Sequence, residues 1–488
     1  MELTELINSV NAIQVAGEVE RKDVSSICYD SRKVKQNSIF VAIKGANTDG
    51  HRFILDAINN GAIAVILEDN DIVPDDIFIH EKKAKILVVD SRKALAEISC
   101  ALYKKPSEKI NLIGITGTNG KTTTTYFIKS ILETSGEKTG LIGTITNYIG
   151  DKEIKSSLTT PESNDLNELL YRMYKEGCSY AVMEVSSHSL VMNRVYGLNF
   201  SSAVFTNITS DHLDFHGTFE NYLNAKKVLF DFLKASSFAF YNSDDTHSKK
   251  LVGNSKASLT SYGTSSNSDF VLKNINYDLN GTTFTVEHKG DLFPISTSLI
   301  GKFNAYNACA AFAVGFTSGI KEGKIIEGIK NTKQVPGRFE VISKGNKKVI
   351  IDYSHTADSL EKALLAVRDI VNDSVPVYAV FGCGGNRDKT KRPVMGKIAT
   401  ELSNYVLVTS DNPRFEDPFR IINDIKTGIT KDNYTVIENR EEAISYAIKN
   451  SEENAVILIA GKGHENYQEI KGIRNHFSDR EVAEKYLV

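Results

Sequence analysis

The sequence lacks any apolar run that approaches about 18 residues, so it offers no evident membrane-spanning helix. Its first residues, MELTELINSVNAI, lack the basic and apolar regions of a signal peptide. Cysteine is scarce, and the five cysteines are dispersed without a CxxC pair, which suits reduced thiols rather than a disulfide framework. We therefore expect a cytoplasmic protein that does not insert into a membrane.

An excess of charge of one sign is also missing. The chain has 58 Lys and Arg against 61 Asp and Glu, a net charge of −3. Nothing in this balance favours nucleic acid or an anionic membrane as a partner, so any anion must be bound at a locally built site. The 488 residues are too many for one core. We predict three domains, at residues 1–100, 101–335 and 336–488, in a chain that works as a monomer.

Hydrophobic patterning is what the sequence has in abundance. Near-continuous apolar segments at 110–115, 180–185 and 202–208 alternate with helical patterns such as 121–135, which predicts a parallel α/β sheet. Residues 266–297 alternate polar and apolar side chains, as antiparallel strands do. Beyond residue 336, strand, loop and helix repeat, and the polar loops follow strand ends, where open α/β sheets bind ligands.

The segment GITGTNGKTTT, which starts at Gly114, predicts a phosphate-binding loop between a strand and a helix. Backbone N–H groups and the positive end of the helix cradle phosphates, Lys121 reaches the β- and γ-phosphates, and Thr122 or Thr123 reaches Mg²⁺. The strict GxxxxGK[ST] spacing is not met, and we expect Gly114 and Gly117 to form the turn instead. The alternative is a tight strand–helix turn that merely contains a lysine. The predicted ATP-binding residues here are Gly117, Thr118, Asn119, Gly120, Lys121, Thr122 and Thr123.

This loop is similar to that of the Mur ligase family, which also includes folylpolyglutamate synthetase. The resemblance continues over nearly the whole chain, from Asp30 to Glu465. It implies an α/β protein with three domains: a small N-terminal domain, a central parallel-sheet domain of the P-loop ATPase kind, and a Rossmann-like C-terminal domain. It also implies an ATP-dependent, Mg²⁺-requiring ligase that activates a carboxylate as an acyl phosphate and joins it to an amine.

Carboxylate and imidazole groups follow two predicted strands. Glu184 ends an apolar strand, and residues 206–217 contain two His and two Asp. A carboxylate facing the phosphate loop suits Mg²⁺, although a solvated glutamate and a structural loop are the alternatives. The family resemblance implies catalytic roles for Lys121, Glu184, His212 and Lys226, with Lys226 carbamylated. Without the family, Lys226 or its neighbour Lys227 reads as an exposed helix charge. The implied metal-binding residues are Thr122, Glu184, His212 and carbamylated Lys226.

The base and ribose of ATP have their own candidate residues. Asn304 and Asn307 stand one helical turn apart, so both amides share a face that can read the adenine edge. The alternative for Asn304 is that it caps the helix. By resemblance, Arg338, Asp352 and His355 lie near the ribose and the phosphates.

Two further groups resemble the branch of the family that adds the third amino acid to a cell-wall precursor. The implied acid substrate is UDP-MurNAc-L-Ala-D-Glu, and Arg194 offers its phosphate or carboxylate groups a planar donor fork. Met192 stands where some relatives have Gln. The residues implied to bind this substrate are Ser31, Ala46, Asn47, Thr48, Thr159, Thr160, Ser186, Met192 and Arg194.

The amine substrate is implied by the DNPR segment at 411–414. Meso-diaminopimelate differs from lysine by a second carboxylate, which Arg414 can pair with bidentately while Arg387 holds the other end. The alternatives for Arg414 are a turn cap or a pair with Glu416 or Asp417. The residues implied to bind diaminopimelate are Arg387, Asp411, Asn412, Pro413, Arg414, Gly461 and Glu465, with Glu465 taking an ammonium group.

Three other functions stay open from the sequence. The same ligase can use L-lysine or a diaminopimelate analogue such as lanthionine. A ligase like folylpolyglutamate synthetase is less compatible with the N-terminal segment and with DNPR. A nucleotide-binding switch without ligase activity would not need a separate domain that carries arginines.

Overall fold

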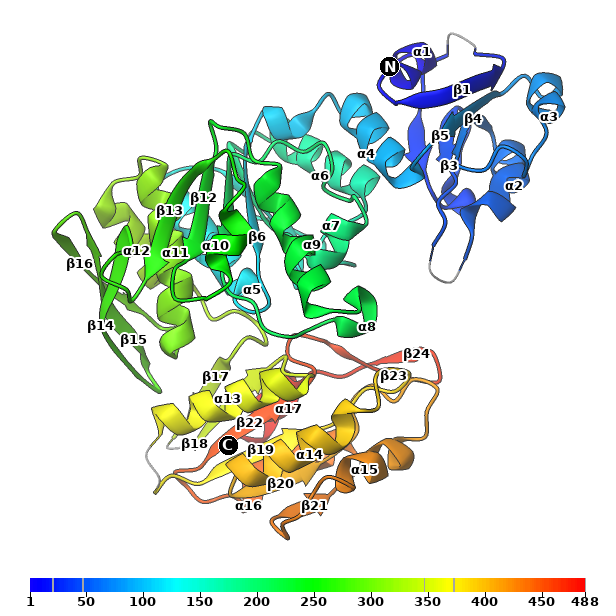
Figure 1. The fold of residues 1–488 in the computed structure, drawn as a ribbon. Helices are drawn as coiled ribbons and strands as arrows, with labels where there is room; N and C mark the ends of the chain where they lie inside the picture. The colour runs from blue at the N-terminus through cyan, green and yellow to red at the C-terminus, as the bar shows by residue number, and fades with distance from the viewer. Residues whose placement is uncertain (20–21, 46–47, 346, 372–373, 488) are drawn as a thin grey trace. The chain divides into compact units, whose positions relative to one another are not determined.

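The computed structural model describes residues 1–19, 22–45, 48–345, 347–371 and 374–487 (Figure 1). It groups into two compact units, and each is described by itself below. The first comprises Met1–Lys121, Gly136–Ile208 and Thr218–Ser261; the second comprises Thr122–Ser135, Thr209–Gly217 and Tyr262–Val488. Within the described part of the chain, no helix combines the length and apolarity that a bilayer crossing requires.

The N-terminal part of the first unit is a five-stranded sheet of order β1-β5-β4-β3-β2, in which only β1 runs antiparallel to its neighbour. Alternate strand residues pack on two faces: one against α1 and α4, the other against α2 and α3. Asp90 caps α4 by accepting from the backbone N–H groups of Arg92 and Lys93 at 2.9 and 3.0 Å. The elements are α1 (Leu3–Ile7), β1 (Ala12–Gly17), β2 (Ser26–Cys28), η1 (Ser31–Lys33), β3 (Ser38–Val41), η2 (Gly50–Phe53), α2 (Ile54–Asn59), β4 (Ala62–Leu67), α3 (Asp75–His80), β5 (Ala84–Val88) and α4 (Ser91–Leu102).

A second sheet region of the first unit has the order β12-β11-β6-β10-β7-β8-β9. The five strands from β12 to β7 are parallel, as predicted, and β8 and β9 extend them as antiparallel strands. Strand β6 lies between β10 and β11, in registers that pair Ile115 with Glu184 and Thr116 with Phe205. The carboxyl ends of these three strands therefore meet at one edge. The elements are η3 (Pro106–Glu108), β6 (Asn111–Thr116), β7 (Thr139–Ile142), β8 (Thr146–Ile149), β9 (Lys152–Lys155), α6 (Ser163–Lys175), β10 (Tyr180–Glu184), α7 (Ser187–Val191), β11 (Ser202–Phe205), α9 (Phe219–Asp231), β12 (Phe238–Asn242) and α10 (Ser248–Val252); β13 (Ser258–Gly263) leads into the second unit.

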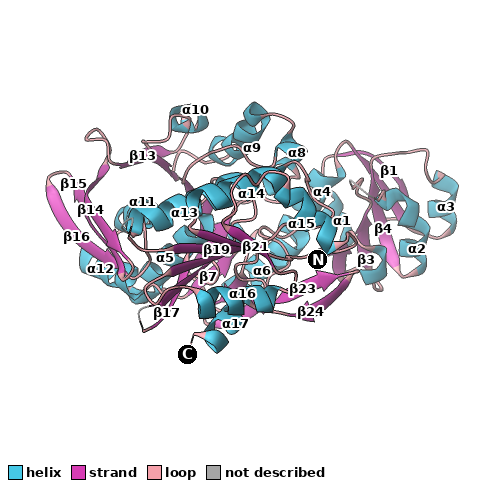
Figure 2. Cartoon of the chain, turned by 90° about the horizontal axis from the view of Figure 1, so that it is seen from below, coloured by secondary structure: helices cyan, strands magenta, loops and turns pink. Residues whose placement is uncertain are grey.

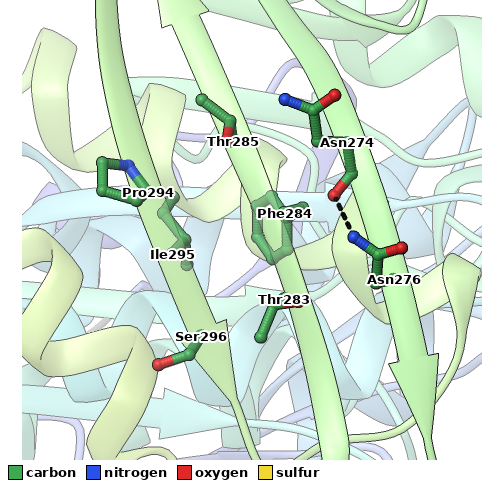
Figure 3. Close-up of a pocket in the computed structure, with 8 residues that line it drawn as sticks. All are labelled: Asn274, Asn276, Thr283, Phe284, Thr285, Pro294, Ile295 and Ser296. Atoms are coloured by element: carbon green, nitrogen blue, oxygen red, sulfur yellow. Dashed lines mark hydrogen bonds between the residues drawn. The ribbon is translucent and has the colours of Figure 1, made fainter.

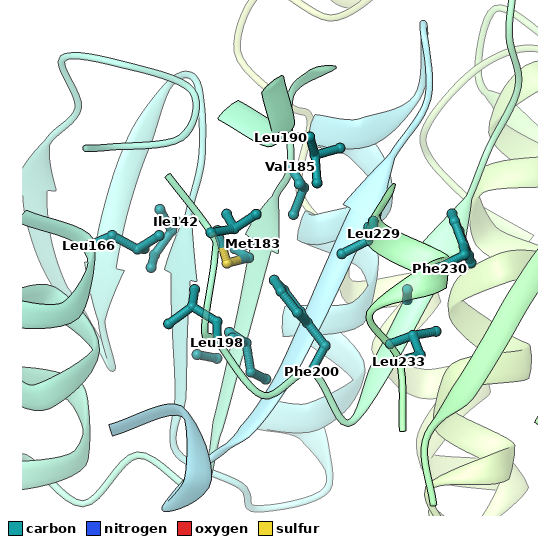
Figure 4. Packing of buried hydrophobic residues seen from close by; sticks show 14 of the residues in the cluster. Ile142, Leu166, Met183, Val185, Leu190, Leu198, Phe200, Leu229, Phe230 and Leu233 are labelled. Carbon is teal, nitrogen blue, oxygen red and sulfur yellow. The ribbon is translucent and has the colours of Figure 1, made fainter. Parts of the chain in front are cut away.

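A close-packed core fixes these strands. Met183 and Phe200 lie at its centre, with Leu166 and Leu229 around them (Figure 4). Each fully buried side chain of this size contributes about 1.5–3 kcal/mol. Gly114 lies inside β6, where an added Cβ would meet the Phe200 ring at 2.8 Å. The prediction that Gly114 belongs to the phosphate-loop turn is therefore wrong: its small size serves packing.

The second unit contains helix α5, which begins at the phosphate loop, and an antiparallel β14–β15–β16 sheet where the sequence predicts one. Gly136 follows α5 with φ +96°, as expected of a residue that ends a helix. Close packing of α5 on α12 requires Gly328, since a Cβ there would lie 2.5 Å from the Ile131 Cα. The elements are α5 (Lys121–Thr134), α8 (Leu213–His216), β14 (Phe270–Asp278), β15 (Gly281–His288), β16 (Asp291–Thr297), α11 (Lys302–Thr317) and α12 (Glu322–Asn331).

The C-terminal part of the second unit is a six-stranded sheet of order β17-β18-β22-β19-β20-β21, parallel except for β17. Helices α13, α14 and α15 cover one face, and α16 and α17 cover the other (Figure 2). This is the predicted Rossmann-like layering. The elements are β17 (Glu340–Lys344), β18 (Lys347–Asp352), α13 (Ala357–Ile370), β19 (Val377–Phe381), α14 (Lys391–Leu402), β20 (Tyr405–Val408), α15 (Pro418–Lys426), β21 (Tyr434–Val436), α16 (Arg440–Asn450), β22 (Val456–Ala460), β23 (Tyr467–Ile470), β24 (Ile473–His476) and α17 (Asp479–Tyr486).

Candidate active site

The predicted phosphate loop is held by the end of the neighbouring strand β11. The backbone N–H of Thr118 donates to the carbonyl of Asn207 at 2.8 Å, and that of Asn119 donates to the Asn207 side chain at 3.0 Å. Thr206 Oγ1 donates to the carbonyl of Asn119 at 2.6 Å. A Cβ on Gly117, which has φ +152°, would lie 1.9 Å from Thr206 Oγ1. The sequence did not single out Thr206 and Asn207 as supports for this loop.

Two lysines converge on the loop. Lys121 Nζ donates to the carbonyls of Gly117 and Thr118 at 3.0 and 2.9 Å. Lys226 Nζ donates to the same Gly117 oxygen at 2.8 Å and lies 4.5 Å from the centre of the Tyr222 ring. Lys226 is 1% exposed, whereas Lys227 pairs with Asp231 one turn further along the same helix. Of the two neighbouring lysines Lys226 and Lys227, Lys226 is therefore the one that contacts the phosphate loop.

Glu184 lies at the end of β10, buried to 1% exposure. One carboxylate oxygen accepts from the backbone N–H of Thr144 at 2.8 Å, and the other accepts from its hydroxyl at 3.1 Å. The Thr144 hydroxyl also bonds to that of Thr159 at 3.1 Å. Glu184, predicted as a metal ligand, is therefore connected to Thr159, predicted to bind the UDP substrate. Thr144 was missed by the sequence reasoning.

The donor chemistry fits a hard cation in part. Glu184 offers carboxylate oxygens and Thr122 a hydroxyl, the oxygen donors that Mg²⁺ prefers, but Lys226 as an ammonium group is a donor and not a ligand. His212 has φ +53°, and its Nε2 lies 3.5 Å from a carboxylate oxygen of Asp211. Glu184 and Lys226 belong to the first unit, Thr122 and His212 to the second. Within the described residues, no three His, Cys, Asp or Glu side chains form a metal-binding group.

The two candidate adenine-reading amides are buried at the start of α11. Asn307 Nδ2 donates to Asn304 Oδ1 at 3.1 Å, and Asn304 Nδ2 donates to the carbonyl of Ile300 at 2.9 Å. Thr124 of the phosphate-loop helix donates to Asn307 Oδ1 at 3.4 Å. Gly301 occupies the N-cap position of α11, so the alternative that Asn304 caps this helix is wrong. These bonds join α11 to α5.

Arg338, Asp352 and His355 come together around Tyr353, which the sequence reasoning missed. The Arg338 guanidinium lies 5.0 Å from the centre of the Tyr353 ring, and the rings of His355 and His464 lie 4.7 and 5.2 Å from it. Burial, with a smaller effect of the nearby Arg338 charge, lowers the pKa of His464 to about 4. Burial also raises the pKa of Asp352, whose carboxylate accepts from the backbone N–H of Phe339 at 2.8 Å.

The N-terminal residues predicted to bind the UDP substrate lie at the ends of β2 and β3. Ser31 is buried, and its carbonyl accepts from the Asn60 side chain at 3.0 Å. The exposed Thr48 accepts from the backbone N–H of Gly45 at 2.9 Å. Ala46 and Asn47 lie outside the described residues.

The other residues predicted for this substrate surround Arg194. Its guanidinium donates to the carbonyl of Thr160 at 3.1 Å and pairs with Glu162 at 2.9 Å, and the Met192 sulfur lies 3.4 Å away. Glu162 also pairs with Arg92 at 3.4 Å. One carboxylate thus lies between two guanidinium groups, which leaves net positive charge for an acidic ligand.

Thr160 and Ser186 complete this group. Thr160 is 1% exposed, and its hydroxyl donates to the carbonyl of Glu184 at 2.9 Å. The backbone N–H of Ser186 donates to the Thr160 hydroxyl at 3.1 Å, and the Ser186 hydroxyl caps α7. Among the candidate residues, Glu184 is therefore linked by hydrogen bonds to Thr159, Thr160 and Ser186.

The predicted diaminopimelate residues occupy loops after β19, β20 and β22. Arg414 Nη1 donates to the carbonyl of Gly385 at 2.8 Å. A Cβ built on Gly384 would lie 3.0 Å from Arg414 Nη1 and 3.8 Å from Arg387 Cγ, so both arginines flank that glycine. The predicted pair of Arg414 with Glu416 or Asp417 does not form, whereas its bond to the Gly385 carbonyl is compatible with the other alternative, a turn cap. Glu416 pairs with Arg392 and Lys389, and Asp417 caps α15.

Tight backbone contacts bring the other residues of this group together. A Cβ on Gly385 would lie 2.0 Å from the carbonyl of Pro413, and one on Gly461, at φ +119°, would lie 2.7 Å from Asp411 Oδ2. Asn412 Nδ2 donates to Glu465 Oε2 at 2.8 Å. Glu465 also accepts from Lys462, a buried residue to which the sequence reasoning gave no role.

Two buried arginines support these loops through ion pairs. The Arg392 side chain is 0% exposed, binds both carboxylate oxygens of Glu416 at 3.0 Å, and pairs with Asp424 at 2.8 Å. Arg440 pairs with Asp479 at 2.7 Å, with both side chains 0% exposed, and donates to the carbonyl of Ala460 at 3.0 Å. No sequence pattern distinguishes such arginines from exposed ones.

A hollow also lies on the β14–β16 sheet of the second unit (Figure 3). Its polar lining comes from alternate residues that face outward, while Phe284 and Ile295 are largely buried beneath. The lining residues are Asn274, Asn276, Thr283, Phe284, Thr285, Pro294, Ile295 and Ser296.

Three family models match the chain. The Mur ligase catalytic domain matches residues 23–103, the Mur ligase middle domain 115–315, and the Mur ligase glutamate ligase domain 337–463. A glycine-rich phosphate loop and arginine-bearing loops occur at strand ends within the second and third of these ranges. The chain belongs to the Mur ligase family, a class of ATP-dependent ligases.

Particular relatives narrow this class. A UDP-N-acetylmuramoyl-L-alanyl-D-glutamate--2,6-diaminopimelate ligase of Clostridium botulinum is 45% identical over 96% of this chain and 96% of its own. One of the same name from Clostridium tetani is 43% identical over 100% of this chain and 99% of its own. A solved structure with this name is 30% identical, has a TM-score of 0.70 and covers 100% of this chain and 98% of its own. The predicted three-domain α/β fold is confirmed.

Proposed function

We propose that this chain is the ligase that adds meso-diaminopimelate to UDP-MurNAc-L-Ala-D-Glu, with cleavage of ATP, in peptidoglycan precursor synthesis. Relatives with this activity in their names share 43–45% of its residues over nearly the full length. We further propose that it acts in the cytoplasm as a monomer. All five cysteines are buried thiols, which suits a reducing compartment.

The first half of the reaction belongs to the phosphate loop. The free carboxylate of the D-Glu residue attacks the γ-phosphorus of ATP, which gives an acyl phosphate and ADP. Lys121 Nζ already points at the carbonyls of its own loop, and it exchanges one of them for a phosphate oxygen when ATP binds. The bonds that join Asn119 to Thr206 and Asn207 keep the loop in shape before ATP arrives.

Mg²⁺ would be held by Glu184, Thr122 and His212, with carbamylated Lys226 as a further oxygen donor. When bound, it would neutralise charge on the phosphates. Glu184 has the chemistry and burial for this role, and the Thr144 hydroxyl fixes its orientation.

The second half of the reaction belongs to the C-terminal loops. The amine attacks the acyl carbon, and the tetrahedral intermediate collapses to an amide and phosphate. Three groups orient the amine substrate. Arg414 binds the carboxylate at its far end, and Glu465 binds the ammonium group there. Arg387 binds the carboxylate beside the attacking nitrogen. The observation that carries this choice is that Arg414 and Arg387 flank one glycine, Gly384. Lysine, which lacks the far carboxylate, would leave Arg414 without a substrate partner.

Phosphate release from ATP tests the proposal. Purified chain is supplied with UDP-MurNAc-L-Ala-D-Glu, ATP and Mg²⁺, plus meso-diaminopimelate, lanthionine, L-lysine or L-glutamate. We expect release and tripeptide formation with diaminopimelate, and at least tenfold less with lysine. Equal turnover with lysine would contradict the amine assignment. In a parallel assay with a folate in place of the UDP substrate, turnover with L-glutamate would contradict the acid assignment.

Arg414→Lys and Arg414→Ala test the selecting residue. Both should raise the KM for diaminopimelate, because neither retains the bidentate fork, with a loss of about 10- to 100-fold for Arg414→Ala. The preference over lysine should shrink by the same factor. Arg420→Ala, on α15 in the same domain, serves as the control. An unchanged preference in Arg414→Ala would remove Arg414 as the selector.

A further inference from the structure

A buried lysine lies directly behind the proposed amine site. Lys462 follows β22, and its side chain is 0% exposed. Its Nζ donates to Asn412 Oδ1 at 3.1 Å and to Glu465 Oε2 at 3.1 Å. The same Nζ lies 5.4 Å from the centre of the Tyr467 ring. The ammonium group is therefore enclosed by two polar partners and one aromatic ring.

These contacts fix the direction of the Asn412 amide. Its Oδ1 accepts from Lys462 Nζ and from the backbone N–H of Glu469, the latter at 2.9 Å. With two donors aimed at that end, the other end must be the NH₂ group, which donates to Glu465 Oε2 at 2.8 Å. Asn412 and Lys462 thus bind the same oxygen of Glu465.

A buried ammonium group is costly unless it is paired. Here the carboxylate of Glu465 offsets the cost, and the proposed reaction needs that carboxylate at a defined position. Because the bonds from Lys462 and Asn412 fall on Oε2, the carboxylate group is turned so that Oε1 is the oxygen left for a substrate. The ammonium group of Lys462 also neutralises part of the negative charge of Glu465. The site therefore favours a substrate end that carries both an ammonium and a carboxylate group over one that carries an ammonium group alone.

We propose that Lys462 is a positioning residue for the amine substrate: it orients Asn412 and Glu465 so that Glu465 Oε1 receives the far ammonium group of diaminopimelate. This inference rests on the proposed function. It assigns Lys462 no contact with ATP, with the UDP substrate or with the reacting atoms.

Steady-state kinetics of Lys462→Met and Lys462→Gln test the proposal. Lys462→Met removes both hydrogen bonds while keeping a similar length, and should raise the KM for diaminopimelate about 10- to 100-fold. The KM values for ATP and for the UDP substrate should stay within about twofold. Lys462→Gln keeps donors for Asn412 and Glu465 and should give an intermediate KM. Lys397→Met, an exposed lysine of α14 in the same domain, is the control and should change none of these values.

A double-mutant cycle separates positioning from general support of the fold. If Lys462 acts through Glu465, Lys462→Met should add little to the KM of a Glu465→Gln chain, within about twofold. Independent, multiplicative effects would overturn the proposal, as would equal rises in all three KM values. If the parent chain turns over no diaminopimelate, the proposed function itself fails. If it does and Lys462→Met leaves the amine KM unchanged, only this inference fails. A melting temperature raised by ADP in each variant shows that the chain has folded.

Discussion

Lys121 and Lys226 donate to one and the same acceptor, the backbone carbonyl of Gly117, at 3.0 and 2.8 Å. Two ammonium groups on one oxygen repel each other, and Lys226 is buried, so water screens this repulsion poorly. Conversion of Lys226 to a carbamate would replace the repulsion with attraction. The arrangement therefore favours the modification that the family resemblance implies for Lys226.

Removal of CO₂ should reduce activity. In buffers freed of CO₂ and bicarbonate, we expect phosphate release to fall several-fold and to recover when bicarbonate is added. Lys226→Met should lower kcat about 100- to 1000-fold, the range seen when one preorganised electrostatic group is lost. The neighbouring Lys227→Met, whose lysine pairs with Asp231, should stay near the parent rate. Full activity of Lys226→Met without bicarbonate would contradict the role of a carbamate.

Gly117→Ala should damage the phosphate loop. The new Cβ would lie 1.9 Å from Thr206 Oγ1, which now fixes the loop by donating to Asn119. We expect a loss of about 1–3 kcal/mol in the free energy of unfolding and at least tenfold weaker ATP binding, measured by urea titration and calorimetry. Gly136→Ala is the matched control. That glycine also has positive φ, but no heavy atom would lie within 4 Å of its Cβ. The Gly136→Ala chain should therefore lose stability without losing affinity for ATP.

Glu416→Gln should loosen the loops that carry Arg387 and Arg414. Hydrogen bonds from Arg392 hold the pKa of Glu416 down at about 2, and the side chain of Arg392 is 0% exposed. Removing the charge leaves a buried guanidinium with Asp424 as its remaining acid, so we expect a loss of about 2 kcal/mol in the free energy of unfolding. The KM for diaminopimelate should rise several-fold. Glu401→Gln, on the exposed side of α14, should change neither quantity.

Acid should destabilise the chain partly through His464. Its pKa is about 4 in the folded protein, below the ordinary value of 6.5. Between these values the unfolded chain binds a proton that the folded chain does not, so stability falls as the pH is lowered through this window. We expect His464 to account for about 1–2 kcal/mol between pH 7 and pH 5. Urea titrations of His464→Gln at both pH values should show a smaller difference. Equal differences would contradict this effect.

Much of the architecture was predictable because it depends on local pattern. The apolar segments 110–115 and 180–185 became β6 and β10, side by side and parallel, and Lys121 begins a helix as its loop predicted. Glycine was harder to interpret. Gly117 has the positive φ of a turn, whereas Gly114 is small because Phe200 packs on it. Sequence spacing cannot separate these two reasons for a glycine.

Site residues that act through distant partners were not predictable. Asn207 supports a loop almost ninety positions before it, at Asn119. Lys462 reads as one more charged residue until its ammonium is found between Asn412 and Glu465. The domain boundaries at residues 100 and 335 and the individual ligand contacts remain predictions.

The sequence by itself determined the phosphate loop and, through its resemblance to the Mur ligase family, the class of reaction, because the motifs that carry both are short and contiguous. It also determined the sheet types, since hydrophobic period follows from strand geometry. Only the tertiary structure decided which lysine reaches Gly117, which oxygen of Glu465 is already bound, and which arginines are buried supports. Those outcomes depend on packing between segments far apart in the chain. There, burial holds a charged side chain in one position against its partners.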